Sequence, residues 1–125
     1  MRYLCLGYHD VDASKRLSSE EFTAIVSHCP EYDKELLASG RVRIVASLVE
    51  DEVVTVRTRG GEVTLTDGPC VESKEQVGSF FVLEASDLND AVRIASRHPA
   101  ARLGEDLGWA VEVRPIGSME EYGGV

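Results

Sequence analysis

His28 is the side chain in this sequence best suited to acid–base chemistry, because an imidazole titrates near neutral pH. It lies in a stretch with helical spacing, and Glu31 and Tyr32 follow it three and four residues later, on the same helical face. We therefore predict His28 as a general base and Tyr32 as a ligand contact. Asp33 lies off that face and approaches it only if Pro30 bends the chain. The alternative is a partly exposed helix histidine without a role.

A second group of candidate residues lies in residues 67–78, a stretch of twelve residues without a hydrophobic period. A loop of this length in a compact domain is usually functional or mobile. Asp67 and Glu72 are the carboxylates that could position a base or a substrate. The alternative for Asp67 is architectural, because Asp-Gly-Pro is a turn sequence.

The same loop holds the remaining candidate ligand contacts. Lys74 and Glu75 either bind a ligand or anchor the loop by a salt bridge. Cys70 is a possible nucleophile or ligand contact if its thiolate is stabilised, and otherwise a small buried apolar residue.

Neither a metal nor a cofactor is expected. His9 and Asp10 could join His28 in a metal site, but their spacing is not diagnostic. The sequence has no Gly-rich dinucleotide motif, no P-loop and no HExxH. His98 lies near the C-terminal end of a predicted helix, where a protonated histidine interacts favourably with the helix dipole.

The composition restricts the kinds of partner that we expect the protein to bind and the compartment in which we expect it. The chain has 125 residues with 13 basic and 22 acidic side chains, a net charge of −9, so direct nucleic-acid binding and binding to an anionic membrane are not expected. Three scattered cysteines fit a reducing cytoplasm. No apolar run is long enough for a signal peptide or a membrane span. We expect a cytoplasmic protein.

The elements that must position these residues are indicated by periodicity and by turn residues. A capping box at Ser18 and Glu21 begins a helix that Gly40 ends, with a kink or a break near Cys29-Pro30. Gly60-Gly61 predicts a hairpin turn. A later helix begins at Asp87, ends near Pro99 and buries Leu88, Ala91, Val92 and Ala95. Strands are expected at residues 2–8, 42–48, 53–58, 63–65, 80–83 (covered on both faces) and 111–114.

This order predicts an α+β protein with the ferredoxin-like βαββαβ fold, an extra β-hairpin and an antiparallel sheet carrying two helices on one face. Residues 1–116 form one domain, and residues 117–125 form a polar C-terminal tail. Such a sheet leaves its second face uncovered, which favours a homodimer.

The segment from Asp67-Gly68-Pro69-Cys70 to Gly78-Ser79-Phe80 resembles the signature of the DGPF, or YCII-related, family. The similarity extends to Arg2-Tyr3-Leu4-Cys5-Leu6 and to Val111-Glu112-Val113-Arg114-Pro115. It implies a ferredoxin-like domain that pairs into a dimeric α+β barrel. Cys70 and Ser79 depart from the pattern, which has an aromatic residue and a second glycine there.

The resemblance also implies a histidine and aspartate pair. His28 is the nearest match to the histidine, whereas His98 stands before Pro99 where the aspartate is expected. We therefore predict an unidentified small molecule bound between the sheet and the first helix, with isomerase-like or lyase-like proton transfer. The alternative is a non-catalytic accessory protein that acts through a protein partner, because some members of the family accompany sigma factors.

Overall fold

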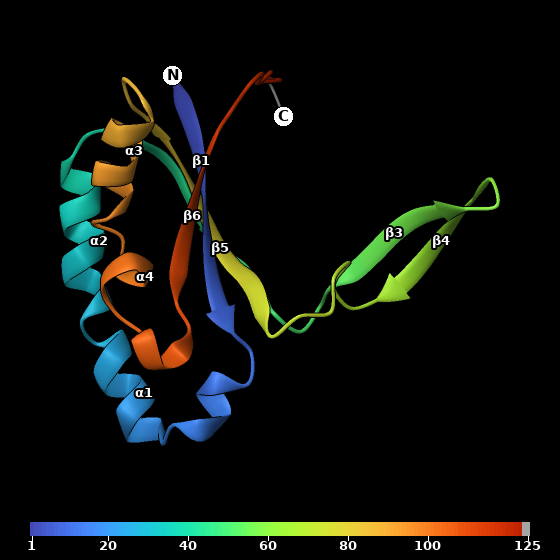
Figure 1. The fold of residues 1–125 in the computed structure, drawn as a ribbon, viewed down its shortest axis with the longest axis horizontal. Coiled ribbons are helices and arrows are strands. Elements are labelled where there is room, and N and C mark those ends of the chain that lie inside the picture. The colour runs from blue at the N-terminus through green and yellow to red at the C-terminus, as the bar shows by residue number, and fades with distance from the viewer. Residues whose placement is uncertain (124–125) are drawn as a thin grey trace.

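A computed structural model describes residues 1–123 and has at its centre a four-stranded antiparallel sheet in the order β2-β5-β1-β6. Its helices lie on one side of that sheet, and one hairpin projects away from the opposite side (Figure 1). The fold is the predicted α+β, ferredoxin-like one with an extra hairpin. In chain order the elements are β1 (Arg2–Asp10), η1 (Ala13–Arg16), α1 (Ser19–Val26), α2 (Cys29–Ala38), β2 (Val42–Ser47), β3 (Val54–Arg59), β4 (Glu62–Asp67), β5 (Glu75–Glu84), α3 (Leu88–Ala95), α4 (Pro99–Arg102), η2 (Glu105–Leu107) and β6 (Ala110–Pro115).

The predicted helix over residues 18–40 is two helices. The Ser18 Oγ accepts the Glu21 backbone N–H at 3.1 Å, and the Glu21 carboxylate accepts the Ser18 N–H at 3.0 Å, so the predicted capping box is present. The expected break near Pro30 is confirmed, because α1 ends at Val26 and Pro30 lies in the first turn of α2. Proline is tolerated there, since the first-turn N–H groups have no partner within the helix.

The hydrophobic core lies between the sheet and the helices. Alternate residues of β1 face it, and Tyr3 and Cys5 are fully buried against Phe81 and Leu83 of β5. Leu36 of α2 is buried in the same cluster. Burial raises the pKa of the Cys5 thiol to about 12, so this cysteine packs as a small apolar residue.

Helix α3 is rotated relative to the prediction. Ala91, Ala95 and Ile94 are buried, whereas Leu88 and Val92 are 47% and 45% exposed. The prediction that Leu88 and Val92 belong to the buried stripe is therefore wrong. The buried stripe contains Ile94 in place of Leu88 and Val92.

Strand β5 is central, but the expectation that it is covered on both faces is wrong within one chain. The helices cover only the face that carries Phe81 and Leu83. The opposite face places Phe80 beside Leu6 of β1 and Val82 beside Leu4, with Ile44 of β2 next to Val82. These apolar residues are flanked on β6 by Arg114 and Glu112, and no helix of residues 1–123 covers this face.

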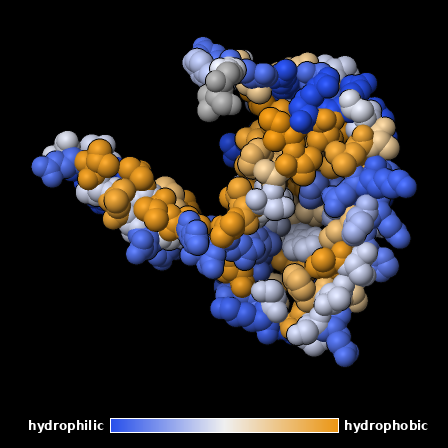
Figure 2. Space-filling model, turned by 180° about the vertical axis from the view of Figure 1, so that it is seen from behind, coloured by the Kyte–Doolittle hydropathy of each residue, from blue (hydrophilic) through white to orange (hydrophobic). Residues whose placement is uncertain are grey.

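The predicted hairpin forms as β3 and β4, which pair only with each other and stand away from the main sheet (Figure 1). Gly60 and Gly61 make its turn with φ values of 58° and 80°, which glycine adopts at little cost. Apolar side chains lie along it, exposed by between 54% and 71%, and they form the row that Figure 2 shows on the projecting arm: Val54, Val56, Val63 and Leu65.

No helix within residues 1–123 is long and apolar enough to cross a membrane.

Candidate functional site

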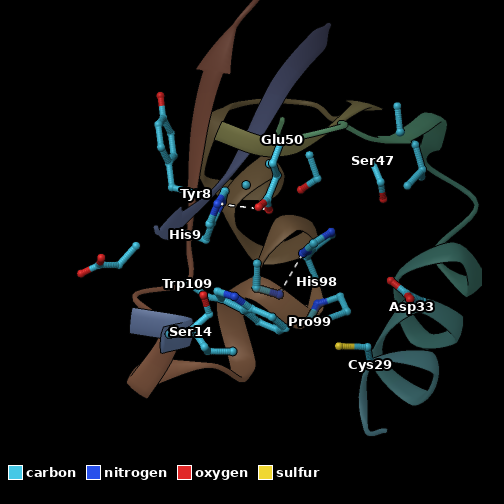
Figure 3. Close-up of a pocket in the computed structure, with 18 of the residues that line it drawn as sticks. Tyr8, His9, Ser14, Cys29, Asp33, Ser47, Glu50, His98, Pro99 and Trp109 are labelled. Atoms are coloured by element: carbon cyan, nitrogen blue, oxygen red, sulfur yellow. Dashed lines mark hydrogen bonds and ion pairs between the residues drawn. The ribbon is translucent and has the colours of Figure 1, made fainter. Parts of the chain in front are cut away.

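A cavity of about 700 Å³ lies between the helix-side face of the sheet, α2 and the segment around α4 (Figure 3). Its volume is in the range of small-molecule sites. Its walls are largely apolar, with Phe22, Leu36, Leu37, Val45, Leu107 and Trp109 among the lining residues. Its polar groups come from β1, η1, α2, the end of β2 and the segment after it, β5 and the start of α4: His9, Asp10, Ser14, Cys29, Asp33, Ser47, Glu50, Ser79 and His98.

His98 is the most constrained of these polar groups. It is only 9% exposed, and its ring stacks on Phe81 with centroids 4.7 Å apart and planes 3° from parallel. It also caps α4, because Nδ1 accepts the Ala100 backbone N–H at 2.9 Å. Burial lowers the pKa of His98 below its ordinary value of 6.5, and the negative charge of Asp33 opposes that shift. The ring is therefore held neutral near pH 7.

The cap also fixes which nitrogen of His98 carries the proton. A nitrogen that accepts an N–H has its lone pair in that bond, so the neutral imidazole must hold its proton on Nε2. No described residue hydrogen-bonds Nε2, and this atom is not among the buried polar atoms without a partner. Figure 3 shows the second nitrogen on the side of the ring away from the dashed contact to the backbone.

His9 is the second imidazole of the cavity. Its Nε2 lies 3.2 Å from Glu50 Oε1, in an ion-pair contact whose direction is unsuitable for a hydrogen bond. The Nδ1 lies against Gly78, where an added Cβ would be 2.9 Å from it. Glycine at position 78 therefore leaves room for this ring.

The charge of the cavity is negative. Asp10, Asp33 and Glu50 line it, and none of its lining residues is lysine or arginine. Asp10 has a local role, because its Oδ1 accepts the backbone N–H groups of Asp12 and Ala13 at 2.9 and 3.2 Å. Burial and the charge of Asp33 raise the pKa of the Cys29 thiol, so Cys29 is protonated and is not a nucleophile at neutral pH.

The structure does not bring the predicted catalytic residues into one cavity. His28 is exposed at the N-cap position of α2, and Asp67 ends β4 on the projecting hairpin. Glu72 lies in the loop after the hairpin. Neither His28, Tyr32 nor Asp67 lines the cavity described above, and Glu72 does not either.

The loop residues instead line a second hollow of about 1040 Å³ between the base of the hairpin and the sheet, with Cys70, Glu72 and Glu75 among its lining residues. The backbone carbonyl of Lys74 accepts the Val11 N–H at 2.8 Å. Cys70 is exposed and lies 3.2 Å from the Arg57 guanidinium, so its interpretation as a buried apolar residue is wrong. The loop faces outward because the hairpin carries it away from the core.

The cavity holds three groups that were not predicted together: His98, Asp33 and the His9–Glu50 pair. Within residues 1–123 no cluster of three or more His, Cys, Asp or Glu side chains is placed to hold a metal ion.

The chain matches a known protein family over most of its length. The family described as YCII-related domain matches residues 1–117. The chain belongs to the YCII-related family. An uncharacterised protein of Rhizobium meliloti (strain 1021) is 29% identical over 117 residues, which cover 93% of this chain and 92% of that protein.

Among solved structures, the YCII-related chain is similar to the 5-chloro-2-hydroxyhydroquinone dehydrochlorinase TftG of Burkholderia phenoliruptrix AC1100, determined in complex with 2,5-dihydroxybenzoquinone. The identity is 15%, the TM-score is 0.41, and the match covers 98% of this chain and 96% of that one.

Proposed function

We propose that this YCII-related protein binds a small, uncharged organic molecule in the cavity between the sheet and α2, and that it catalyses proton transfer on that molecule. The observation that supports this most directly is that His98 and the His9–Glu50 pair line one cavity with largely apolar walls. Imidazoles are the side chains best matched to proton transfer near neutral pH. The predicted base, His28, is replaced in this proposal, because it lies outside the cavity.

The charge of the lining supports an uncharged ligand. Asp33 and Glu50 contribute carboxylates and no lining residue contributes a permanent positive charge. A phosphate or carboxylate would meet repulsion without a partner, which is costly in a partly desolvated site. The apolar walls favour a compact ring or hydrocarbon body.

The binding site can be tested by NMR titration of the isotope-labelled protein with neutral cyclic ketones and alcohols, and with carboxylates of matched size. We expect saturable shifts at Ser47, Ser79 and His98 with neutral compounds only. The variant Val45→Trp should fill the cavity and abolish the shifts, because Val45 is a lining residue that takes no part in the proposed proton transfer. Val56→Trp, on the hairpin, is the matched control. Shifts confined to the second hollow would refute the assignment.

We further propose that the chain forms a homodimer through the uncovered sheet face. Leu4, Leu6, Phe80 and Val82 form an apolar layer there, and such a face is normally buried against a partner. Light scattering coupled to size exclusion should give twice the chain mass of 13.7 kDa. Leu6→Glu should convert the protein to a monomer, whereas Thr58→Glu on the hairpin should not. A wild-type protein that is monomeric at every concentration would contradict the proposal.

A non-catalytic accessory role through a protein partner is the second candidate, and the projecting hairpin favours it. The exposed apolar side chains of β3 and β4 lie outside the sheet face assigned to the homodimer. If this role is correct, Val56→Asp with Leu65→Asp should abolish recovery of a transcription factor with the tagged protein, while leaving the dimer intact. Recovery of the same factor with the wild-type and the variant protein would refute it.

A further inference from the structure

We propose that His98 serves this cavity as a neutral hydrogen-bond donor and that the His9–Glu50 pair serves it as the proton acceptor, so that the substrate is an uncharged carbonyl compound with an acidic proton next to the carbonyl. This inference rests on the proposed function and assigns its two histidines opposite roles.

The donor role follows from the contacts of His98. Its Nδ1 is occupied by the Ala100 N–H at 2.9 Å, so its Nε2 carries a proton and is the nitrogen left for a ligand. A neutral imidazole in this state cannot accept a proton at Nε2, but it can donate to an oxygen. Stacking on Phe81 and the cap on α4 hold the ring in place, so the donor is preorganised.

The acceptor role follows from the contacts of His9. Glu50 Oε1 lies 3.2 Å from Nε2, so the charge of the carboxylate favours a proton on that nitrogen, although the contact is not a hydrogen bond. The lone pair is then on Nδ1, which lies beside Gly78, a residue that lines the cavity. The carboxylate also stabilises the imidazolium that forms when Nδ1 takes a proton.

The two roles define one balanced reaction step. His9 Nδ1 takes a proton from the carbon beside the carbonyl, and the electron pair of that C–H bond forms a C=C bond. The carbonyl oxygen becomes an enolate oxygen, which the His98 Nε2–H stabilises. Return of the proton from His9 to the same carbon or to a conjugated one completes an exchange or an isomerisation without a further reactant. A donor aimed at the developing oxyanion contributes about 100-fold to 1,000-fold in rate.

The charge of the cavity favours a carbonyl group over an anionic acceptor. Phe81 stacks on the His98 ring and the charge of Asp33 acts on it, and the residues that line the cavity include no lysine or arginine. A neutral carbonyl can accept the Nε2 proton without bringing a second negative charge beside Asp33.

The probe is 2-tetralone, an uncharged ketone with exchangeable protons beside its carbonyl, and tetralin is the control ligand without the oxygen. Loss of the probe's exchangeable proton signals in D₂O, followed by NMR, measures proton abstraction without knowledge of the natural substrate. We expect the wild-type protein to bind 2-tetralone in preference to tetralin and to exchange its protons faster than buffer.

Two variants of His98 separate the donor from the cap. His98→Asn keeps an acceptor for the Ala100 N–H and removes the donor at Nε2, so we expect exchange to fall about 100-fold while the α4 cap is retained. His98→Gln keeps an amide donor near Nε2 and removes the cap, so we expect exchange to fall less than about tenfold, with a lower melting temperature. His9→Asn should still bind the ketone and should not exchange its protons.

A measurement on the wild-type protein keeps the test independent of the variants. The nitrogen chemical shifts of His98 should show an Nε2-protonated neutral ring, with and without 2-tetralone. An Nδ1-protonated ring, or a wild-type exchange rate in His98→Asn, overturns the roles while leaving the binding site intact. Failure of the wild-type protein to bind 2-tetralone overturns the substrate class and the proposed function together.

Discussion

The burial of His98 predicts that the protein loses stability as the pH falls below about 6.5. Its side chain is 9% exposed and burial lowers its pKa from the ordinary value of 6.5. Above pH 6.5 the imidazole is neutral in the native and the unfolded state, so its contribution to stability is complete and constant. Below pH 6.5 the unfolded chain binds a proton that the native protein does not bind. Each pH unit then costs up to about 1.4 kcal/mol, until the native pKa is reached.

This loss is large enough to measure by calorimetry. An unfolding entropy of about 2.1 cal/mol/K per residue gives roughly 0.26 kcal/mol/K for a chain of 125 residues. The melting temperature should therefore fall by roughly 5 °C per pH unit. Asp90 acts in a different window, because hydrogen bonds from Ser86 and Arg93 lower its pKa from 3.8 to about 2. Its contribution is present above pH 3.8 and is lost as the pH falls toward 2.

The comparison that isolates His98 is the wild-type protein against His98→Asn, measured from pH 7.5 to pH 5. Asparagine retains a side-chain acceptor for the α4 cap and does not titrate. The other two histidines are present in both proteins, so their contributions cancel in the difference. Below pH 6.5, the melting temperature of the wild-type protein should fall more steeply with decreasing pH than that of His98→Asn. Parallel curves over this range would refute the argument, and a shallower wild-type curve would show that the charge of Asp33 outweighs the burial.

Two glycine substitutions test the packing around the cavity by urea denaturation. Gly104→Ala should lower the free energy of unfolding by about 3 kcal/mol, because φ is +73° and the new Cβ would lie 2.3 Å from the Trp109 ring. The control Gly60→Ala, at φ +58° with nothing within 4 Å, should lower it by only about 1 kcal/mol. Equal losses in the two variants would contradict the clash with Trp109. Gly7→Ala would place a Cβ 2.2 Å from Ser79 Oγ and should lower the free energy of unfolding by about 1–3 kcal/mol. In the Ser79→Gly variant, which lacks that hydroxyl, the same substitution should cost at least about 1 kcal/mol less. An equal loss in the wild-type protein and in the Ser79→Gly variant would rule out the contact.

The features that could be predicted from the sequence are those that neighbouring residues determine. The capping box at Ser18 and Glu21, the break at Pro30 and the turn at Gly60-Gly61 each depend on a few consecutive residues, and all three are present. The exposure of Leu88 could not be predicted in the same way. Helical spacing defines a stripe but not the rotation of the helix, which packing against the sheet decides.

The burial of His98 could not be inferred from the residues around it, because it depends on a contact that is distant in the sequence. A histidine before a proline indicates the end of one helix, and here it also begins the next one by accepting the Ala100 N–H. Its burial depends on Phe81, seventeen residues earlier, and on the way α4 folds back over the sheet. The contact with Phe81 leaves no local pattern in the sequence.

Asp33 differs from His98, because the sequence does contain a signal for it. Cys29 and Leu36 belong to the apolar stripe of the helix, and Asp33 lies four residues after the first and three before the second. These spacings place its carboxylate on the same helical face, which packs toward the sheet because Leu36 is buried. His28 precedes α2 and therefore does not take part in this face. A single carboxylate within an apolar stripe needs a polar partner across the interface, and in this fold the cavity and His98 occupy that place.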